Sequence, residues 1–199
     1  IMLVVSPNIA FSAWEEETLG FNGIEYLCLN KGTYINTGLI NENINNDKIV
    51  MNVGYSAFWR LTKTINRKFF NQAIIVVDES QRVKNWSSKV GRFAKTVSLF
   101  FDRVYLLSGT PIATPRDWFN QGKILRIDNP EFKTLTSFDD KFTIFETRHM
   151  GFKTFIEPVG FKNVELLEQM LKPKQIRLTT KEVGLQLPEQ IFQDIKLKP

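Results

Sequence analysis

The chain has 199 residues, of which 43% are hydrophobic and 24% charged, and its formal net charge is +5. This composition predicts a folded domain with one core and excludes a disordered chain. The single cysteine, Cys28, excludes an internal disulfide, and together with the single histidine, His149, it leaves too few ligands for a zinc site.

Hydropathy and charge also limit the classes of partner that the sequence allows. No apolar run approaches the roughly 18 residues that a membrane-spanning helix needs, and no signal peptide is visible. We therefore expect no membrane partner and a cytoplasmic or nucleoid-associated protein. The positive balance suits a polyanionic partner, although a solvated basic surface would have the same composition.

Apolar runs alternate with helix-forming segments along residues 1–128. The runs predict strands over residues 1–5, 25–29, 48–53, 74–77 and 104–107. Helices are expected after Ser6-Pro7, from Gly54-Tyr55, over about 88–100 and from near Pro115. Such alternation is typical of an α/β fold, a parallel sheet flanked by helices. The asparagine-rich stretch 31–48 is expected to be a loop or an irregular excursion.

The start of the chain has two notable features. Ile1 already lies inside a predicted strand, so the chain looks like a fragment of a longer one. The helix that follows has Asn8 or Ser12 as its candidate cap, and Ser12 and Glu15 have the spacing of a capping box.

Beyond residue 128 the sequence becomes aromatic-rich and less regular. We expect residues 129–175 to form a helical appendage that includes an amphipathic helix over 163–172, and residues 176–199 to form a linker. The phenylalanines of the appendage are expected to be buried anchors, because no repeating pattern of basic residues marks them as platforms for stacking bases. They are Phe132, Phe138, Phe142, Phe145, Phe152, Phe155 and Phe161.

One stretch carries a candidate for chemistry, because Asp78 and Glu79 directly follow the apolar run 74–77. That run predicts a strand buried on both faces, and the carboxyl edge of a parallel sheet faces the crevice where ligands bind. An aspartate there can hold Mg²⁺ through its water shell, and a neighbouring glutamate can polarise an attacking water. Taken alone, such a pair is more often a plain polar loop.

The sequence after this pair carries a family resemblance. Residues 78–89, DESQRVKNWSSK, and residues 106–112, LLSGTPI, occur in this order at the ends of two predicted strands. They resemble motifs II and III of superfamily-two helicases, specifically the Swi/Snf-type double-strand DNA translocases. The strand and loop at 1–7 with Trp14 resemble the family's motif Ia, residues 48–55 loosely resemble motif Ib, and residues 176–189 resemble the segment that leaves the first ATPase lobe.

The resemblance implies that residues 1–128 are part of a RecA-like lobe of the P-loop NTPase type, incomplete at its N-terminus, with ATP and Mg²⁺ as cofactors. By motif position Asp78 would anchor Mg²⁺ through water and Glu79 would activate the attacking water. Gln81 would contact the phosphate side or couple to a partner lobe. The residues that would couple the nucleotide and DNA sites are Ser108, Gly109 and Thr110.

The resemblance also implies DNA as a partner. Contacts would go mostly to phosphates and would be insensitive to sequence, since a translocase must accept any sequence. The candidate contacts are Ser6, Pro7, Asn8, Arg82 and Lys84. For Arg82 and Lys84 the start of a solvated helix is an equal alternative.

One element of an ATPase is missing from the sequence, since no Gly-x-x-x-x-Gly-Lys-Ser/Thr phosphate loop occurs. This loop normally precedes motif Ia, so we expect a truncation before Ile1, and we expect the 199 residues alone to bind ATP poorly and not to hydrolyse it. The parent is predicted to be an ATP-dependent DNA helicase or translocase with a second RecA-like lobe. The alternatives are a non-catalytic DNA- or protein-binding module with the same fold, and an unrelated doubly wound α/β enzyme.

Overall fold

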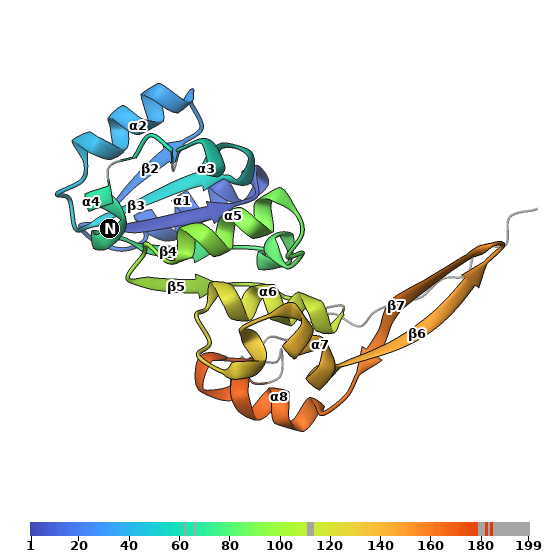
Figure 1. Cartoon of the computed structure of the whole chain (residues 1–199). Coiled ribbons are helices and arrows are strands. Elements are labelled where there is room, and N and C mark those ends of the chain that lie inside the picture. The colour runs from blue at the N-terminus through green and yellow to red at the C-terminus, as the bar shows by residue number, and fades with distance from the viewer. Residues whose placement is uncertain (62, 66, 111–113, 179–181, 183, 185–199) are drawn as a thin grey trace, which may run out of the picture. The chain divides into compact units, whose positions relative to one another are not determined.

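The computed structural model describes residues 1–61, 63–65, 67–110, 114–178, 182 and 184. Its centre is a five-stranded sheet in the order β2-β3-β1-β4-β5, in which all neighbouring strands are parallel (Figure 1). The strands are β1 (Met2–Ser6), β2 (Glu25–Leu29), β3 (Ile49–Gly54), β4 (Ile74–Val77) and β5 (Arg103–Leu106). The α/β class and the five predicted strands are confirmed.

Helices cover both faces of this sheet because the central strands are apolar on both faces. On one face Val4, Val50 and Val76 pack with Trp14 of α1. On the other face Leu3, Met51 and Ile75 belong to a larger core that includes side chains of the remaining helices. The helices are α1 (Phe11–Leu19), α2 (Thr33–Glu42), α3 (Tyr55–Leu61), α4 (Arg67–Gln72), α5 (Lys89–Ser98) and α6 (Pro115–Ile124).

The predicted capping of the first helix is wrong. A 3₁₀ turn, η1 (Asn8–Ala10), follows Pro7 and runs directly into α1, whose N-cap Ala10 makes no side-chain capping bond. Inside this turn the Ala10 N–H donates to the Pro7 carbonyl at 2.9 Å, and the N–H of Phe11, the first residue of α1, donates to the Asn8 carbonyl. The turn therefore replaces the capping box expected at Ser12 and Glu15.

The asparagine-rich stretch is also not the loop that was predicted, because residues 33–42 form α2. Asn36 is fully buried, and its amide group organises the turn that enters this helix. Its Nδ2 donates to the carbonyls of Leu29 (3.1 Å) and Lys31 (2.8 Å), and its Oδ1 accepts from the Lys31 N–H (3.2 Å). The asparagine thus supplies hydrogen bonds that a loop would have taken from water.

We expect Asn36→Ala to lower the free energy of unfolding by about 2 kcal/mol, because one buried and two part-buried backbone groups lose their partner. Asn41→Ala is the matched control, since Asn41 lies exposed on the same helix. Urea denaturation of the 199-residue chain measures both. Equal effects of the two substitutions would contradict the organising role of Asn36.

The appendage is only partly helical. It contains the 3₁₀ turn η3 (Pro130–Phe132), α7 (Leu135–Phe142), α8 (Val164–Leu171) and the 3₁₀ turn η4 (Lys172–Lys174). Between the helices, β6 (Thr143–Met150) and β7 (Lys153–Phe161) form an antiparallel hairpin (Figure 1). The sequence favours it locally, since β-branched and aromatic residues are frequent in both strands and Gly151 takes the positive φ of 60° at the turn.

Burial divides six of the seven phenylalanines of the appendage into two groups, and the seventh, Phe161, is half-buried. Phe132, Phe138 and Phe142 are buried, as predicted. Phe145, Phe155 and Phe152, on the hairpin and at its turn, are 37%, 37% and 111% exposed, so the prediction of buried anchors is wrong for them. A two-stranded ribbon has no second layer to bury its side chains, which explains the difference.

The chain divides into two compact units, Ile1–Val164 and Glu165–Pro199. The sheet, the hairpin and most of the predicted appendage therefore share the first unit. Of the predicted linker, residues 179–181, 183 and 185–199 lie outside the described residues. No helix among the described residues is long and apolar enough to cross a membrane.

Candidate functional site

Asp78 and Glu79 lie at the carboxyl edge of the sheet, where β4 ends. The Asp78 N–H donates to the Val5 carbonyl of β1 at 2.9 Å, which continues the strand pairing by one residue. The Ser80 N–H donates to the Leu107 carbonyl at 2.8 Å, so the segments that follow β4 and β5 are held together. Because β4 and β5 are neighbours, the two sequence motifs meet at one edge of the sheet.

The Asp78 carboxylate is oriented from two sides. Its Oδ1 accepts from the Glu79 N–H at 2.9 Å, and its Oδ2 accepts from the Trp14 indole Nε1 at 3.0 Å. Trp14 also packs against Val4, Val50 and Val76, and the sequence did not predict its hydrogen bond to a site residue. The resemblance of residues 1–14 to motif Ia was the signal that could have prompted it.

Glu79 has a left-handed backbone conformation, with φ 53° and ψ 52°. Only a few per cent of residues other than glycine adopt a positive φ, and they concentrate at functional sites. The hydroxyl of Tyr55, the first residue of α3, donates to the Asp78 carbonyl at 2.5 Å and lies 3.3 Å from the Glu79 carbonyl. Burial, and next the Asp78 carboxylate, raise the pKa of Tyr55, so this hydroxyl stays protonated at neutral pH.

A chain of hydrogen bonds joins the two motifs. Gln81 Nε2, in the 3₁₀ turn η2 (Ser80–Val83), donates to Glu79 Oε2 at 2.5 Å. Ser108 Oγ donates to Gln81 Oε1 at 2.6 Å, and the Thr110 N–H donates to Ser108 Oγ at 3.1 Å. With Asp78, which accepts from the Glu79 N–H, five predicted site residues therefore form one connected group.

The structure says less about the roles of the remaining motif III residues. Gly109 is exposed, and no atom of the described residues lies within 4 Å of the place where its Cβ would be, so none of them requires a glycine there. Pro111 lies outside the described residues.

The five DNA-contact candidates differ in the exposure of their side chains and in the partners that those side chains already have. Ser6 is fully buried and its Oγ donates to Asn52 Oδ1 at 2.8 Å, while Lys84 Nζ forms an ion pair with Asp117 at 3.1 Å. Asn8 and Arg82 are exposed, and the Arg82 guanidinium lies 5.6 Å from the centre of the Tyr55 ring. Pro7 is half-buried. Asn8 and Arg82 thus have the side chains most available to a partner.

The donor set at the edge of the sheet fits Mg²⁺. No group of three or more His, Cys, Asp or Glu side chains is close enough to form a metal cage among the described residues. Mg²⁺ is usually held by one or two carboxylates together with substrate phosphates and waters, so a half-buried Asp78 beside Glu79 suits it. Asp78 would hold the ion, which would neutralise phosphate charge when bound.

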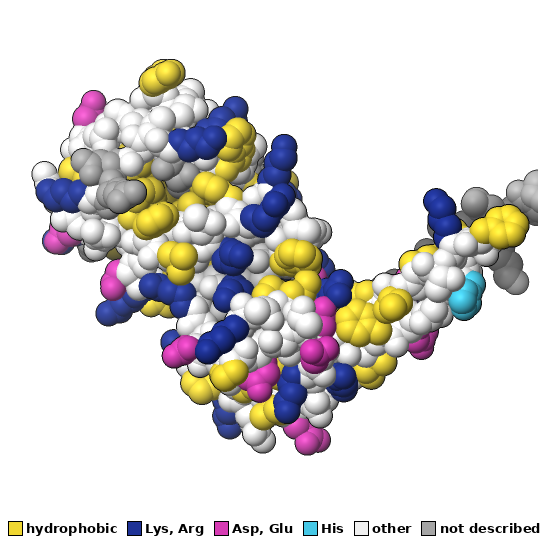
Figure 2. All heavy atoms as spheres, in the orientation of Figure 1, with side chains coloured by type: hydrophobic (Ala, Val, Ile, Leu, Met, Phe, Trp, Pro, Cys, Tyr) yellow, Lys and Arg dark blue, Asp and Glu magenta, His cyan; other side chains and the backbone are white. Residues whose placement is uncertain are grey.

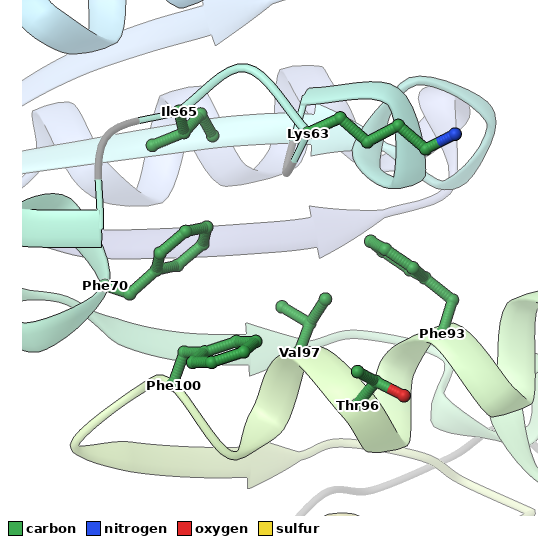
Figure 3. A pocket seen from close by; sticks show the side chains of 7 residues that line it. All are labelled: Lys63, Ile65, Phe70, Phe93, Thr96, Val97 and Phe100. Atoms are coloured by element: carbon green, nitrogen blue, oxygen red, sulfur yellow. The ribbon is translucent and has the colours of Figure 1, made fainter.

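A cleft of about 380 Å³ lies elsewhere, between α4, α5 and the segment that joins α3 to α4 (Figure 3). Phe70, Phe93, Val97 and Phe100 form an apolar lining, with Lys63 across from them. No residue of this lining follows the carboxyl end of a strand, so the cleft is separate from the group around Asp78.

The fold and this group of residues define a class of protein. A parallel α/β sheet that carries an acidic pair at its carboxyl edge is typical of α/β proteins that bind a ligand at that edge. The sequence model of the family described as the SNF2-related domain matches residues 1–199. The chain belongs to this family.

Similar proteins have names that agree with the family. The chain is 27% identical over 197 residues to the "DNA annealing helicase and endonuclease ZRANB3" of Bos taurus, a match that covers 98% of this chain and 18% of the relative. Human ZRANB3 is 27% identical over 146 residues, which are 72% of this chain and 13% of that protein. The chain thus spans less than a fifth of the length of these relatives.

A solved structure described as the Sulfolobus solfataricus SWI2/SNF2 ATPase core in complex with dsDNA has the same fold. The TM-score is 0.59 at 21% sequence identity, over 92% of this chain and 35% of the other. The RecA-like fold class is confirmed by this likeness.

Proposed function

We propose that this chain is part of an ATP-dependent DNA translocase or helicase of the Snf2 type, whose full-length parent couples ATP hydrolysis to movement on duplex DNA. The observation that carries the proposal is the hydrogen-bonded chain from Glu79 through Gln81 to Ser108. It connects the candidate water-activating carboxylate to the segment after the neighbouring strand. A movement of Ser108 can therefore shift the Glu79 carboxylate, and the reverse.

Each site residue has a proposed role in ATP hydrolysis. Asp78 holds Mg²⁺ through its water shell, and Glu79 accepts a hydrogen bond from the attacking water and polarises it. Gln81 holds the Glu79 carboxylate in place and couples it to Ser108 through a second hydrogen bond. The Thr110 N–H fixes the Ser108 hydroxyl. The phosphate loop and the second RecA-like lobe come from the rest of the parent chain.

Duplex DNA is the proposed partner, held mainly through its phosphates. Asn8 and Arg82 are the exposed candidates near the site. The described helices α3 and α5 add cations and contain no Asp or Glu, and Figure 2 shows Lys and Arg side chains on the face that carries them. These cations are Arg60, Lys89, Arg92 and Lys95. Such a distribution favours a polyanion without selecting a base sequence. A cytoplasmic or nucleoid-associated location is consistent with this partner.

The experiment that tests the proposal is displacement of a third DNA strand from a triplex by the full-length parent. We expect ATP-dependent displacement, because a translocase that moves along duplex removes the third strand without opening the duplex. Separation of a forked duplex without triplex displacement would assign strand opening instead of duplex movement. Neither activity, with ATP and Mg²⁺ present, would contradict the proposal.

A further inference from the structure

Tyr55 connects the segment after β3 to the turn that carries the acidic pair. It is the first residue of α3, yet its hydroxyl hydrogen-bonds to the carbonyls of Asp78 and Glu79, which are 23 and 24 residues away in sequence. These two carbonyls flank the backbone of Glu79, the residue with φ 53°. The hydroxyl therefore binds the turn where the unfavourable backbone conformation lies.

A left-handed glutamate needs such support. This conformation costs an ordinary residue of the order of 1 kcal/mol or more, and it persists only when the surroundings hold it. The Glu79 side chain is exposed, so apolar packing does not fix its direction. Its backbone is restrained by Tyr55 and its carboxylate by Gln81. Loss of the Tyr55 hydroxyl would let the turn relax and turn the carboxylate away from Gln81.

Tyr55 and its neighbour Gly54 also contact the two exposed DNA-contact candidates, Arg82 and Asn8. Arg82 stacks its guanidinium over the Tyr55 ring, with 5.6 Å from its Cζ to the ring centre. The preceding residue, Gly54, lies so close to the turn η1 that an added Cβ would be 2.3 Å from Asn8 Oδ1. Asn8 and Arg82 thus contact Tyr55 or its neighbour, from different elements.

We propose that Tyr55 is a positioning residue that couples DNA contact at Asn8 and Arg82 to the placement of Glu79. The inference rests on the proposed function, and it adds the route by which a bound duplex would stimulate ATP hydrolysis. Duplex phosphates that fix Arg82 also fix the Tyr55 ring on which it stacks, and Asn8 restrains the preceding residue, Gly54, so the Tyr55 hydroxyl holds the Glu79 turn. Tyr55 itself touches neither nucleotide nor DNA in this scheme and acts only through Glu79.

The test is Tyr55→Phe in the full-length parent, because it removes the hydroxyl and keeps the ring on which Arg82 stacks. We expect kcat with saturating duplex DNA to fall about tenfold, the effect of losing one well-placed hydrogen bond in the reacting state. KM for ATP and the dissociation constant for duplex DNA should stay within about twofold, since neither ligand contacts Tyr55. Tyr34→Phe, at an exposed position of α2, is the matched control and should change none of these values.

Hydrogen exchange supplies a second readout that does not depend on activity. Duplex DNA should slow the exchange of amides in residues 79–81 of the wild type and should slow them much less in Tyr55→Phe. Equal protection in both proteins, or an unchanged kcat in the variant beside a DNA-stimulated wild type, would overturn the inference and leave the proposed function standing. A fall in kcat accompanied by an equal loss of ATP or DNA affinity would show a general structural role and would also overturn it. A wild type that hydrolyses no ATP would overturn the proposed function, and this inference with it.

Discussion

Glu79→Gln is expected to lower the ATP turnover of the full-length parent by about 100-fold or more, the range found when a general base is removed. The amide keeps the size of the side chain but cannot accept a proton from water. Glu79 is exposed and is not part of the packed core, so the folded structure and the affinity for ATP should persist.

The control for this substitution is Glu17→Gln, which removes the same charge from an exposed position on α1. It should leave turnover within about twofold of the wild type, as expected for a surface substitution away from the site. Steady-state phosphate release and equilibrium binding of a fluorescent ATP analogue measure the two quantities separately. Turnover that survives in Glu79→Gln would remove Glu79 from the role of water activator.

The second large effect is one of stability. Phe138→Ala is expected to lower the free energy of unfolding by about 3–5 kcal/mol, because removal of a buried aromatic ring leaves a cavity. Phe138 is fully buried, and its ring centre lies 5.6, 5.1 and 5.0 Å from those of Phe119, Phe132 and Phe142. It is therefore the centre of the packing that joins α6, η3 and α7.

Phe152→Ala is the matched control, since it makes the same chemical change at a fully exposed residue of the hairpin turn. It should change the free energy of unfolding by less than about 0.5 kcal/mol. Urea denaturation of the 199-residue chain, followed by far-ultraviolet circular dichroism, compares the two. A similar loss in both variants would mean that the hairpin turn packs against other parts of the chain in solution.

The strands of the sheet and the acidic pair at its edge could be predicted from local sequence. Short β-branched runs such as 74–77 predict buried strands without any knowledge of their neighbours, and the acidic pair after one of them predicts the edge of the sheet. The contact between Gln81 and Ser108 depends on the pairing of β4 with β5, which the structure shows and the sequence did not predict.

The parts that could not be predicted depend on distant partners. Trp14 reaches Asp78 across 64 residues and Tyr55 reaches Asp78 across 23, so no local pattern distinguishes them from ordinary core aromatics. Helix α2 was hidden because Asn36 reads as a loop residue until its three backbone partners are known. The hairpin was hidden because its phenylalanines are typical of a core, although the ribbon leaves several of them exposed.

The central claim is that the group around Asp78 and Glu79 hydrolyses ATP when duplex DNA is bound. The most direct measurement is the steady-state ATPase rate of the full-length parent, compared without DNA, with single-stranded DNA and with duplex DNA. We predict that duplex DNA gives the largest stimulation. No turnover under any of the three conditions, or a rate that DNA does not change, would contradict the claim.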